Sequence, residues 1–282
     1  FFVSFFELSK IKPDVIVSMG AYSSIPSVIA AWFLRIPIIL HEQNAVVGKA
    51  NKFLSRFAKK IALSFEESAQ FLQNQQQKLV ITGNPVREEF LFIDKSKKNP
   101  EDFTILVLGG SQGSMAINSA VVDMLFLEDF QKSKIKKIIH ITGYKGYRDV
   151  LGKTKLFRKN DFKYEVLPYA EKIWQYFSEA DLVISRAGAT AISEIIACSL
   201  PSILIPYPYA AENHQQKNAE ILEKNGAAIV LLQEQLSAKA LLDIINSLKN
   251  NADLLRKMSV SSGLLFKKNA VKDLIQIIYG TA

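Results

Sequence analysis

The sequence has very little cysteine, since Cys198 is the only one among 282 residues. A single thiol cannot form a disulfide within the chain, so we expect a reducing compartment. Long uncharged apolar runs are missing too. The most apolar stretch, residues 25–40, is interrupted by Arg35 and Pro37. It therefore predicts a buried helix followed by a buried strand, and we expect neither a membrane span nor a signal peptide.

Several metal and nucleotide motifs are also absent. No Asp-x-Asp pair occurs, so there is no obvious clamp for a metal–diphosphate complex. The glycine-rich segment at residues 109–113 has neither the G-x-G-x-x-G spacing of dinucleotide sites nor the lysine of a P-loop. His41 and Glu42 are not part of an H-E-x-x-H pattern, which excludes a zinc protease. We expect no metal and no cofactor.

The charge is unevenly balanced, with a formal net charge of +8. A basic excess favours an anionic partner, which could be a nucleic acid, nucleotide phosphates or an anionic membrane surface. The lysines are scattered and no nucleic-acid recognition motif occurs, so we expect no nucleic acid.

Short apolar runs alternate with helix-length segments along the whole chain. Four such runs precede residue 88 and six follow residue 102. Runs that are apolar throughout are typical of strands buried on both faces of a parallel sheet. The pattern predicts an α/β fold with doubly wound parallel sheets.

A charged segment at residues 88–102 contains a proline and lacks strand periodicity, so it predicts a linker. We place a first domain at residues 1–94 and a second at residues 95–266. An amphipathic helix at residues 267–282 is expected to pack back on the first domain. Four strands are few for a complete open sheet, and Phe1 starts within a helical pattern. Both features predict that a further segment precedes the first domain.

Two turns of the second half follow a strand and open a helix. One is the glycine-rich run that contains Ser111. The other is SRAGATAISE, where Gly188 permits an unusual backbone angle and Thr190 is expected to cap the helix. Backbone N–H groups and the helix dipole favour phosphate at such turns, although glycine there is as often purely steric. Glu194, near the helix start, could accept two ribose hydroxyls or face solvent.

Other polar residues follow strands in both halves. Gln215 and Asn218 share one face of a later helix, where their amides suit sugar hydroxyls or simple solvation. His41 and Glu42 are a candidate acid/base pair, with a structural role as the alternative. Arg87 follows the last strand of the first half and could reach a phosphate across a cleft.

Five segments together resemble one family, the MurG glycosyltransferases of glycosyltransferase family 28. They are HEQNAVVGKANK, TGNPVR, LGGSQGSMAIN, SRAGATAISE and HQQKNAEIL, in the family's order and spacing. The resemblance covers essentially the whole chain and implies a GT-B fold, with two Rossmann-like domains facing a cleft. It also implies an inverting, metal-independent transfer in peptidoglycan synthesis. N-acetylglucosamine would move from UDP-N-acetylglucosamine to the C4 hydroxyl of undecaprenyl-diphosphate-linked muramyl-pentapeptide.

The resemblance implies a set of donor-site residues. They are Asn44, Arg87, Ser111, Ala170, Ala189, Thr190, Ala191, Ile192, Glu194, Gln215 and Asn218. Within this set, Ser111 and the backbone at residues 189–192 would contact the diphosphate. Glu194 would take the ribose hydroxyls, the backbone of Ala170 would read uracil, and Arg87 would reach the nucleotide across the cleft. Asn44 and Gln215 would lie near the sugar.

The chain departs from the family pattern on the acceptor side. The family's G-G-T-G-G-H loop is missing, and Ser18 and Ala21 replace two glycines of a second loop that keeps Tyr22. The missing loop is thought to supply the base, so a non-catalytic nucleotide-sugar-binding remnant stays an alternative. A GT-B transferase for another lipid acceptor is a further alternative, which the HEQN segment disfavours.

The resemblance implies a peripheral protein on the cytoplasmic face of the bacterial inner membrane, in contact with anionic lipids. The residues in the matching regions are Phe1, Phe2, Phe5, Lys10, Lys12, Trp32, Phe33 and Arg35. The alternative is that the aromatic members are buried core. The helix after residue 48 could also meet an anionic surface through Lys49, Lys52, Arg56, Lys59 and Lys60.

Overall fold

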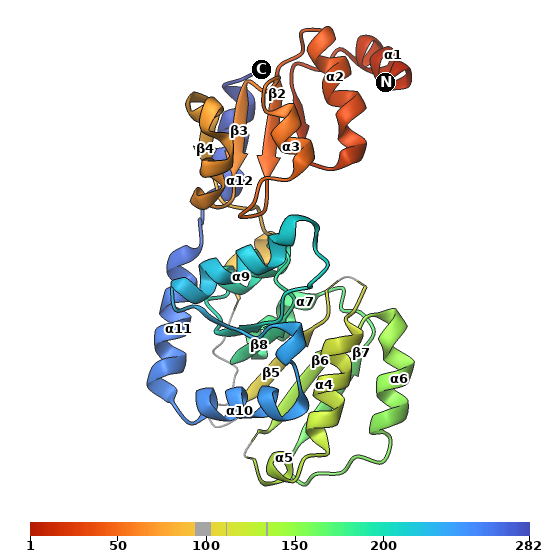
Figure 1. Cartoon of the computed structure of the whole chain (residues 1–282), viewed down its shortest axis with the longest axis vertical. Coiled ribbons are helices and arrows are strands. Elements are labelled where there is room, and N and C mark those ends of the chain that lie inside the picture. Colours follow the sequence, from red (N-terminus) through yellow and green to blue (C-terminus); the bar gives the residue numbers. More distant parts are fainter. Residues whose placement is uncertain (94–102, 111, 134) are drawn as a thin grey trace. The chain divides into compact units, whose positions relative to one another are not determined.

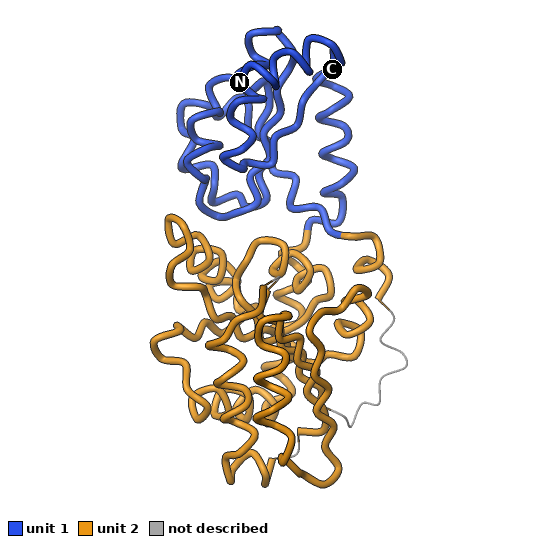
Figure 2. The backbone as a smooth tube through the Cα atoms, turned by 90° about the vertical axis from the view of Figure 1, so that its right-hand side faces the viewer, with its two compact units in different colours: residues 1–86, 267–282 blue, residues 87–266 orange. Residues whose placement is uncertain are grey.

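A computed structural model describes residues 1–93, 103–110, 112–133 and 135–282 of the chain. It divides into two compact units (Figures 1 and 2). Unit 1 comprises Phe1–Val86 and Lys267–Ala282, and unit 2 comprises Arg87–Phe266.

The sequence placed the first boundary after residue 94, whereas unit 2 already begins at Arg87. The physical reason is Phe90 in the 3-10 helix η3 (Glu88–Phe92), which is 1% exposed. Its ring meets that of Phe177 edge-on, with 5.2 Å between centroids. Residues 88–92 are therefore part of a packed unit and are not a linker. Residues 94–102, the rest of the expected linker, lie outside the described residues.

Unit 1 is built on a four-stranded parallel sheet in the order β1-β2-β3-β4. Its strands are β1 (Ile16–Ser18), β2 (Ile38–Glu42), β3 (Lys60–Leu63) and β4 (Leu79–Ile81). Its helices are α1 (Phe2–Ile11), η1 (Tyr22–Ser24), α2 (Ile25–Phe33), α3 (Lys49–Leu54), η2 (Glu66–Lys78) and α12 (Ala270–Tyr279). The hydrophobic core of unit 1 lies between the sheet and the helices, and it includes Leu40 of β2, Leu54 of α3 and Ile61 of β3.

The C-terminal helix α12 is grouped with unit 1, far from it in the sequence (Figure 1). Lys59 donates from Nζ to the carbonyl oxygen of Thr281 at 2.9 Å. A Cβ added at Gly83, where φ is +81°, would lie 2.6 Å from the Cβ of Lys267. The end of the first segment of unit 1, at Gly83, therefore packs closely against the start of its second segment, at Lys267.

Unit 2 contains a six-stranded parallel sheet in the order β10-β9-β8-β5-β6-β7. Its strands are β5 (Thr104–Leu108), β6 (Lys137–Ile141), β7 (Lys163–Leu167), β8 (Leu182–Ser185), β9 (Ser202–Leu204) and β10 (Ala228–Val230). Its α-helices are α4 (Met115–Leu125), α5 (Glu128–Lys132), α6 (Tyr144–Thr154), α7 (Ile173–Glu179), α8 (Ala189–Ala197), α9 (His214–Lys224), α10 (Ala238–Lys249) and α11 (Ala252–Leu265). Two short 3-10 helices, η4 (Ala211–Asn213) and η5 (Gln233–Gln235), complete it together with η3.

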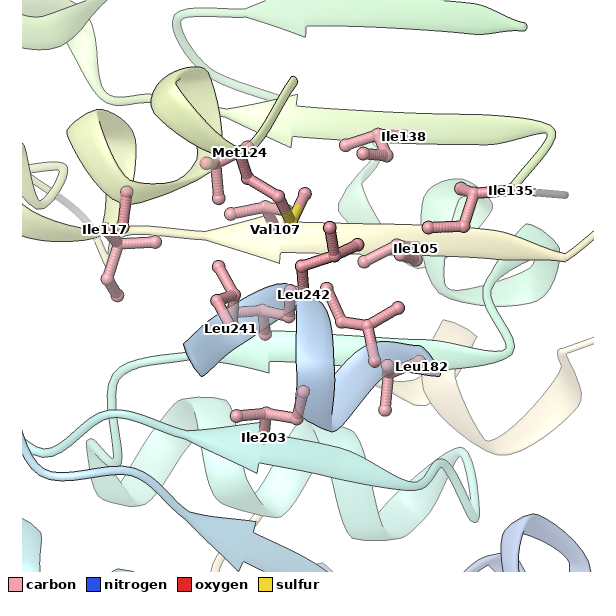
Figure 3. Close-up of a cluster of buried hydrophobic side chains, with 14 of the residues drawn as sticks. Ile105, Val107, Ile117, Met124, Ile135, Ile138, Leu182, Ile203, Leu241 and Leu242 are labelled. Carbon is pink, nitrogen blue, oxygen red and sulfur yellow. The ribbon is translucent and has the colours of Figure 1, made fainter. Parts of the chain in front are cut away.

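The core of unit 2 lies between its central strands and the helices that cover them. Figure 3 shows Ile105 and Val107 of β5 together with Leu182 of β8, close to Leu241 and Leu242 of α10. All five side chains are fully buried. Burial of a side chain of this size contributes about 1.5–3 kcal/mol, so this layer fixes the central strands whose ends carry the candidate site.

The α/β fold predicted from the sequence is confirmed. Each of the ten expected apolar runs forms a strand, and every strand pair is parallel. Within the described residues, each helix is too short or too polar to cross a lipid bilayer.

Candidate functional site

The strand order of unit 2 reverses between β5 and β8. The chain passes from β5 outward through β6 to β7 and returns to the other side of β5 at β8. In open α/β sheets, ligands bind outside the carboxyl ends of the strands at such a point. Here β5 leads through the glycine-rich turn into α4, and β8 leads into α8. Two helix N-termini, each with unpaired backbone N–H groups, therefore border this point.

The turn after β5 approaches the loop after β6 so closely that it requires glycine. At Gly113, where φ is +80°, an added Cβ would lie 2.1 Å from the carbonyl oxygen of Thr142. Ser114 then caps α4, because its Oγ accepts from the N–H of Ile117 at 3.4 Å. Ser111, the expected phosphate contact, lies outside the described residues.

The turn after β8 corrects part of the expectation for α8. Gly188 is the N-cap and no side chain caps the helix, so Thr190 is an exposed residue of the first turn and not the cap. The N–H of Ile192 donates to the carbonyl oxygen of Gly188 at 3.0 Å, and its side chain is fully buried. Its amide is therefore used inside the helix. Ala189, Thr190 and Ala191 are the positions whose amides find no partner within an α-helix.

Glu194 lies one turn into α8 and pairs with Arg87. The Arg87 Nη2 is 3.4 Å from the Glu194 Oε1, and the side chains are 46% and 13% exposed. The guanidinium also lies over the rings of Phe90 and Trp174, at 5.2 and 5.1 Å from their centroids. Burial raises the pKa of Glu194, and the Arg87 cation partly offsets that rise. Both residues belong to unit 2, so Arg87 is part of the same unit as Glu194 and not of unit 1.

Arg186, the arginine just before α8, has a structural role. Its side chain is buried, and its Nη1 donates to the carbonyl oxygens of Ile205 and Pro206, both at 3.0 Å. Its Nη2 donates to Gln233 Oε1 at 2.6 Å. The guanidinium also lies 5.4 Å from the ring centroid of Tyr207. Arg186 thus connects the loops after β8, β9 and β10, a role that sequence reasoning missed because loop carbonyls leave no sequence signal.

The structure separates the two amides expected on α9. Asn218 is fully buried, and its Nδ2 donates to the carbonyl oxygen of Ala187 at 3.1 Å. Its amide therefore holds the turn before α8. Gln215 lies at the start of α9, and its Oε1 accepts from the N–H of Tyr207 at 3.0 Å. The donor group of Gln215 is the one left for a ligand.

Ala170 follows β7 at the same edge of the sheet and is 8% exposed. Its neighbour Tyr169 is 56% exposed and stacks on Tyr144, with 6.1 Å between centroids and 15° between planes. This position, with a small side chain beside stacked aromatic rings, can accommodate a planar base.

In unit 1, His41 and Glu42 are buried, at 0% and 2% exposure. Glu42 Oε1 accepts from the N–H and the side-chain amide of Asn44, at 3.0 and 3.2 Å. Its Oε2 accepts from the N–H of Gly48 and from Asn51 Nδ2, at 3.0 and 2.9 Å. A carboxylate with four donors orders the loop and has little capacity left for proton transfer.

The two ring nitrogens of His41 are likewise occupied. Gln43 Nε2 lies 2.9 Å from Nδ1, and the carbonyl oxygen of Gly83 lies 3.3 Å from Nε2. This arrangement requires the proton on Nε2, and burial lowers the pKa of His41. These contacts favour a structural role for His41 and Glu42, which is the alternative that the sequence left open.

Asn51, which was not a candidate from the sequence, bonds to the end of β2 and packs closely against the loop after β1. Its Nδ2 donates to the carbonyl oxygen of His41 at 3.1 Å as well as to Glu42. A Cβ added at Gly20, where φ is +84°, would lie 2.6 Å from that nitrogen. Tyr22 follows in η1 and is 65% exposed. Tyr22 and half-buried Asn44 are thus presented from the carboxyl ends of neighbouring strands.

No group of three or more His, Cys, Asp or Glu side chains that could hold a metal ion occurs in the part of the chain that the structure describes.

Sequence comparison gives two matches to one family. The profile of the glycosyltransferase family 28 C-terminal domain matches residues 104–277, and that of its N-terminal domain matches residues 1–63. The UDP-N-acetylglucosamine–N-acetylmuramyl-(pentapeptide) pyrophosphoryl-undecaprenol N-acetylglucosamine transferase of Halothermothrix orenii is 41% identical, over 98% of this chain and 76% of its own length. The transferase of the same name from Caldicellulosiruptor saccharolyticus is also 41% identical, over 96% of this chain and 73% of its own.

Structural comparison agrees. The crystal structure of Acinetobacter baumannii MurG has a TM-score of 0.80 and 29% identity, covering 99% of this chain and 78% of that one. The UDP-N-acetylglucosamine 2-epimerase of Neisseria meningitidis has a TM-score of 0.69 at 14% identity, covering 99% of this chain and 80% of that one. The epimerase shares the fold alone.

Proposed function

The chain belongs to glycosyltransferase family 28, and from that premise we propose that it makes the lipid-linked disaccharide of peptidoglycan synthesis. It transfers N-acetylglucosamine from UDP-N-acetylglucosamine to undecaprenyl-diphosphate-linked N-acetylmuramyl-pentapeptide. This is the activity named for relatives that are 41% identical over nearly the whole chain.

The observation that carries the proposal is the pair of helix N-termini at the strand reversal of unit 2. The donor diphosphate lies against the starts of α4 and α8, where Ala189, Thr190 and Ala191 offer backbone amides. Glu194 accepts the ribose hydroxyls, and Arg87 beside it supplies a cation for the nucleotide phosphates. Ala170, next to the stacked tyrosines, contacts the uracil.

The reaction is a direct displacement with inversion at the sugar's C1. The C4 oxygen of the muramyl sugar forms a bond to C1 while the bond from C1 to the diphosphate oxygen breaks. The leaving UDP takes the electron pair, and the hydroxyl proton passes to a base. Negative charge grows on the diphosphate, so preorganised amides and helix dipoles stabilise the transition state more than the ground state.

Unit 1 supplies the acceptor side in this proposal. Tyr22 is its candidate acceptor contact, and Asn44 is the candidate contact of unit 1 to the transferred sugar. Glu42 and Asn51 order the loop that carries Asn44. His41 and Glu42 are not assigned as the base, because their hydrogen bonds are satisfied internally.

A transfer assay tests the function. The full chain is mixed with UDP-N-acetylglucosamine carrying a radiolabel in the sugar and with a lipid-linked muramyl-pentapeptide acceptor. We expect acceptor-dependent appearance of label in the lipid fraction. Tight donor binding without any transfer would favour a nucleotide-sugar-binding protein instead, and transfer to a glycolipid in preference to the muramyl acceptor would favour a different lipid transferase.

We also propose that unit 1 docks on the cytoplasmic face of the membrane. Exposed aromatic residues gather on α1 and α2: Phe1 is 45% exposed, Phe2 85%, Phe6 64%, Trp32 47% and Phe33 60%. The rings of Phe1 and Phe33 lie 5.9 Å apart. The exposed cations Lys10 and Lys12 lie at the end of α1 and Arg35 just after α2. An aromatic surface bordered by cations suits an anionic bilayer.

Vesicle flotation tests the docking surface. We expect binding to vesicles rich in anionic lipid that falls as salt rises, because the attraction between surface charges is screened. Replacement of Phe2 and Phe33 by serine should abolish it. Equal binding to neutral and anionic vesicles would contradict the electrostatic part of this proposal.

A further inference from the structure

An open pocket of about 620 Å³ lies in unit 1 between the end of α3 and η2. Its volume is within the range of about 300–1,000 Å³ found for small-molecule sites. Its lining is mostly polar and consists of Lys52, Ser55, Arg56, Gln70, Phe71, Leu72, Gln73, Asn74 and Gln75. The residues proposed for sugar transfer do not line it.

The pocket is electropositive. Its charged lining residues are Lys52, in the last turn of α3, and Arg56, which follows four residues later, just beyond the end of that helix. Like charges at this spacing repel each other, so an anion between them relieves the repulsion. No carboxylate is among the lining residues to do so.

The Arg56 guanidinium is held in place before any ligand binds. Its Nε donates to the carbonyl oxygen of Phe53 at 3.1 Å. It also lies over the rings of Phe53 and Phe57, at 5.0 and 6.0 Å from their centroids. A cation fixed by aromatic rings loses less conformational entropy when it binds an anion.

Lys78 connects the α3 side of the pocket to the η2 side. Its Nζ donates to the carbonyl oxygens of Ser55 and Arg56, at 3.3 and 3.2 Å. Because Lys78 ends η2 and Ser55 follows α3, this contact fixes the width of the pocket and adds a third positive charge beside it.

The other wall consists of amides. Gln73, Asn74 and Gln75 come from the polar QNQQQK stretch, which none of the proposed functions uses, and Gln70 lies three residues before that stretch. The backbone leaves helical geometry at Leu72 and Gln75, which allows four amides within six residues to line one pocket. Amides donate and accept at once, as hydroxyl groups require.

The pocket borders the aromatic surface proposed to meet the membrane. Phe53 is 42% exposed, and its ring is 5.9 Å from that of Phe57. Phe57 is 5.2 Å from Trp32, and Trp32 is 5.0 Å from Phe33. The ring contacts therefore lead without a break from Arg56 to the exposed face of α2.

We infer that this pocket binds the phosphoglycerol headgroup of an anionic membrane phospholipid. Lys52 and Arg56 hold the phosphate, the amides of η2 bond the glycerol hydroxyls, and the acyl chains follow the neighbouring aromatic rings into the bilayer. The inference rests on the proposed membrane docking and deepens it, because it makes the attachment selective for one headgroup.

Two vesicle compositions of equal charge test the inference. Flotation of the full chain is compared on phosphatidylcholine vesicles containing equal fractions of either phosphatidylglycerol or phosphatidylserine. Each anionic lipid carries one net negative charge, but only phosphatidylglycerol carries a diol. We expect about five-fold tighter binding to the phosphatidylglycerol vesicles, which is the gain from one net hydrogen bond.

Three variants separate the pocket from general attraction. Gln73→Met keeps the charge and should remove the preference while binding to phosphatidylserine vesicles stays unchanged. Lys52→Gln should weaken both and also remove the preference. Lys10→Gln, which removes one exposed cation outside the pocket, should weaken both equally and keep the preference. Dissolved glycerol phosphate should compete with phosphatidylglycerol vesicles for the pocket of the wild-type chain. It should not displace the Gln73→Met variant from these vesicles.

The other outcomes overturn the inference. Equal binding to both vesicle types, or a preference that survives Gln73→Met, would mean attraction by charge alone and leave the docking proposal standing. Absence of binding to either anionic vesicle would overturn the docking proposal as well. Sugar transfer to a soluble short-chain acceptor is measured in parallel and is expected to be the same in all variants, which keeps the proposed activity separate.

Discussion

At the scale of single residues, both candidate sites depend on polar side chains that bond to loop backbone. Arg186 and Asn218 hold the turn before α8 in unit 2, and Glu42 and Asn51 hold the loop after β2 in unit 1. Such bonds preorganise the loops, so that binding a substrate does not have to order them.

Glu194→Gln should weaken UDP-N-acetylglucosamine binding by about ten- to a hundred-fold, because the ribose loses charge-assisted hydrogen bonds worth about 1.5–3 kcal/mol. The fold should be unchanged, since glutamine has the same shape as glutamate and the Arg87 side chain that pairs with it is 46% exposed. Isothermal titration calorimetry measures the affinity, and circular dichroism checks the fold. Glu128→Gln, at an exposed ion pair on α5, is the matched control and should bind normally. Unchanged affinity in Glu194→Gln would refute the ribose contact.

His140 should make the chain sensitive to acid. Burial lowers its pKa to about 3, and it is held between the Tyr164 hydroxyl and Asn118 Oδ1, at 2.7 and 2.9 Å. In the unfolded chain it would titrate near its ordinary pKa of 6.5. Between those values the unfolded state binds the extra proton, so stability falls as the pH drops below about 6.5, by at most about 1.4 kcal/mol per pH unit.

Urea unfolding between pH 7.5 and 5 measures this effect. The variant His140→Gln should be less stable at pH 7.5 but should lose less stability on acidification than the wild-type chain. The same pH dependence in both proteins would show that His140 does not contribute.

The sequence shows the type of these residues but not their partners. Glu194 and Arg87 were both selected from motifs, yet their pairing and common unit follow from the packing of Phe90, which no local pattern reveals. Asn218 was selected for a sugar because its amide lies on a polar helix; its burial against Ala187 is a tertiary contact. His41 and Glu42 were candidates for an acid/base pair because the sequence shows two titratable side chains side by side but not the bonds that they make. The bond from His41 to Gly83 is a tertiary contact, and those to Glu42 depend on how the following loop folds back.

At the scale of elements, the strands were predictable because most of them are short, mainly apolar runs. The strands β2, β5, β8 and β9 are buried along their whole length, whereas the edge strands β1, β4, β7 and β10 are only partly buried. The turn after β5 was predictable only as a glycine-rich turn. Its close approach to the loop after β6 depends on the pairing of β5 with β6, which the sequence does not specify.

Gly113→Ala should therefore disrupt the start of α4. The added Cβ would lie 2.1 Å from the Thr142 carbonyl oxygen, at a backbone angle that side chains rarely adopt. We expect a loss of about 1–3 kcal/mol in unfolding free energy and a loss of donor affinity. Gly152→Ala in α6 is the control, because its Cβ meets nothing within 4 Å. It should stabilise the helix by about 0.5–1 kcal/mol. Equal behaviour of the two variants in urea unfolding would contradict this account of the turn.

At the scale of the whole molecule, the chain leaves unit 1 for unit 2 and returns to unit 1 with its last helix. From the sequence we expected the amphipathic helix at residues 267–282 to pack back on the first domain, and α12 is grouped with unit 1. The sequence alone could not show that unit 2 begins at Arg87, because the segment that forms η3 starts with two glutamates and has the composition of a linker.

A chain that ends at Phe266 should lose stability in unit 1 only. It lacks α12, the buried Ala270 and the bond from Lys59 to Thr281. We expect the unfolding transition of unit 1 to fall by at least about 10 °C, since a domain of this size shifts by about 4–8 °C per kcal/mol. Differential scanning calorimetry should still show a transition that UDP-N-acetylglucosamine raises, because the donor residues assigned to unit 2 remain. Loss of that ligand-dependent shift would show that donor binding needs unit 1.

The central claim is that the strand reversal of unit 2 binds a UDP-sugar, and calorimetric titration of the chain tests it most directly. UDP-N-acetylglucosamine is titrated first and UDP-glucose second. The account predicts saturable binding of UDP-N-acetylglucosamine, weaker binding of UDP-glucose, and loss of binding in Gly113→Ala. Absence of binding by a folded chain, or equal binding in the Gly113→Ala variant, would contradict it.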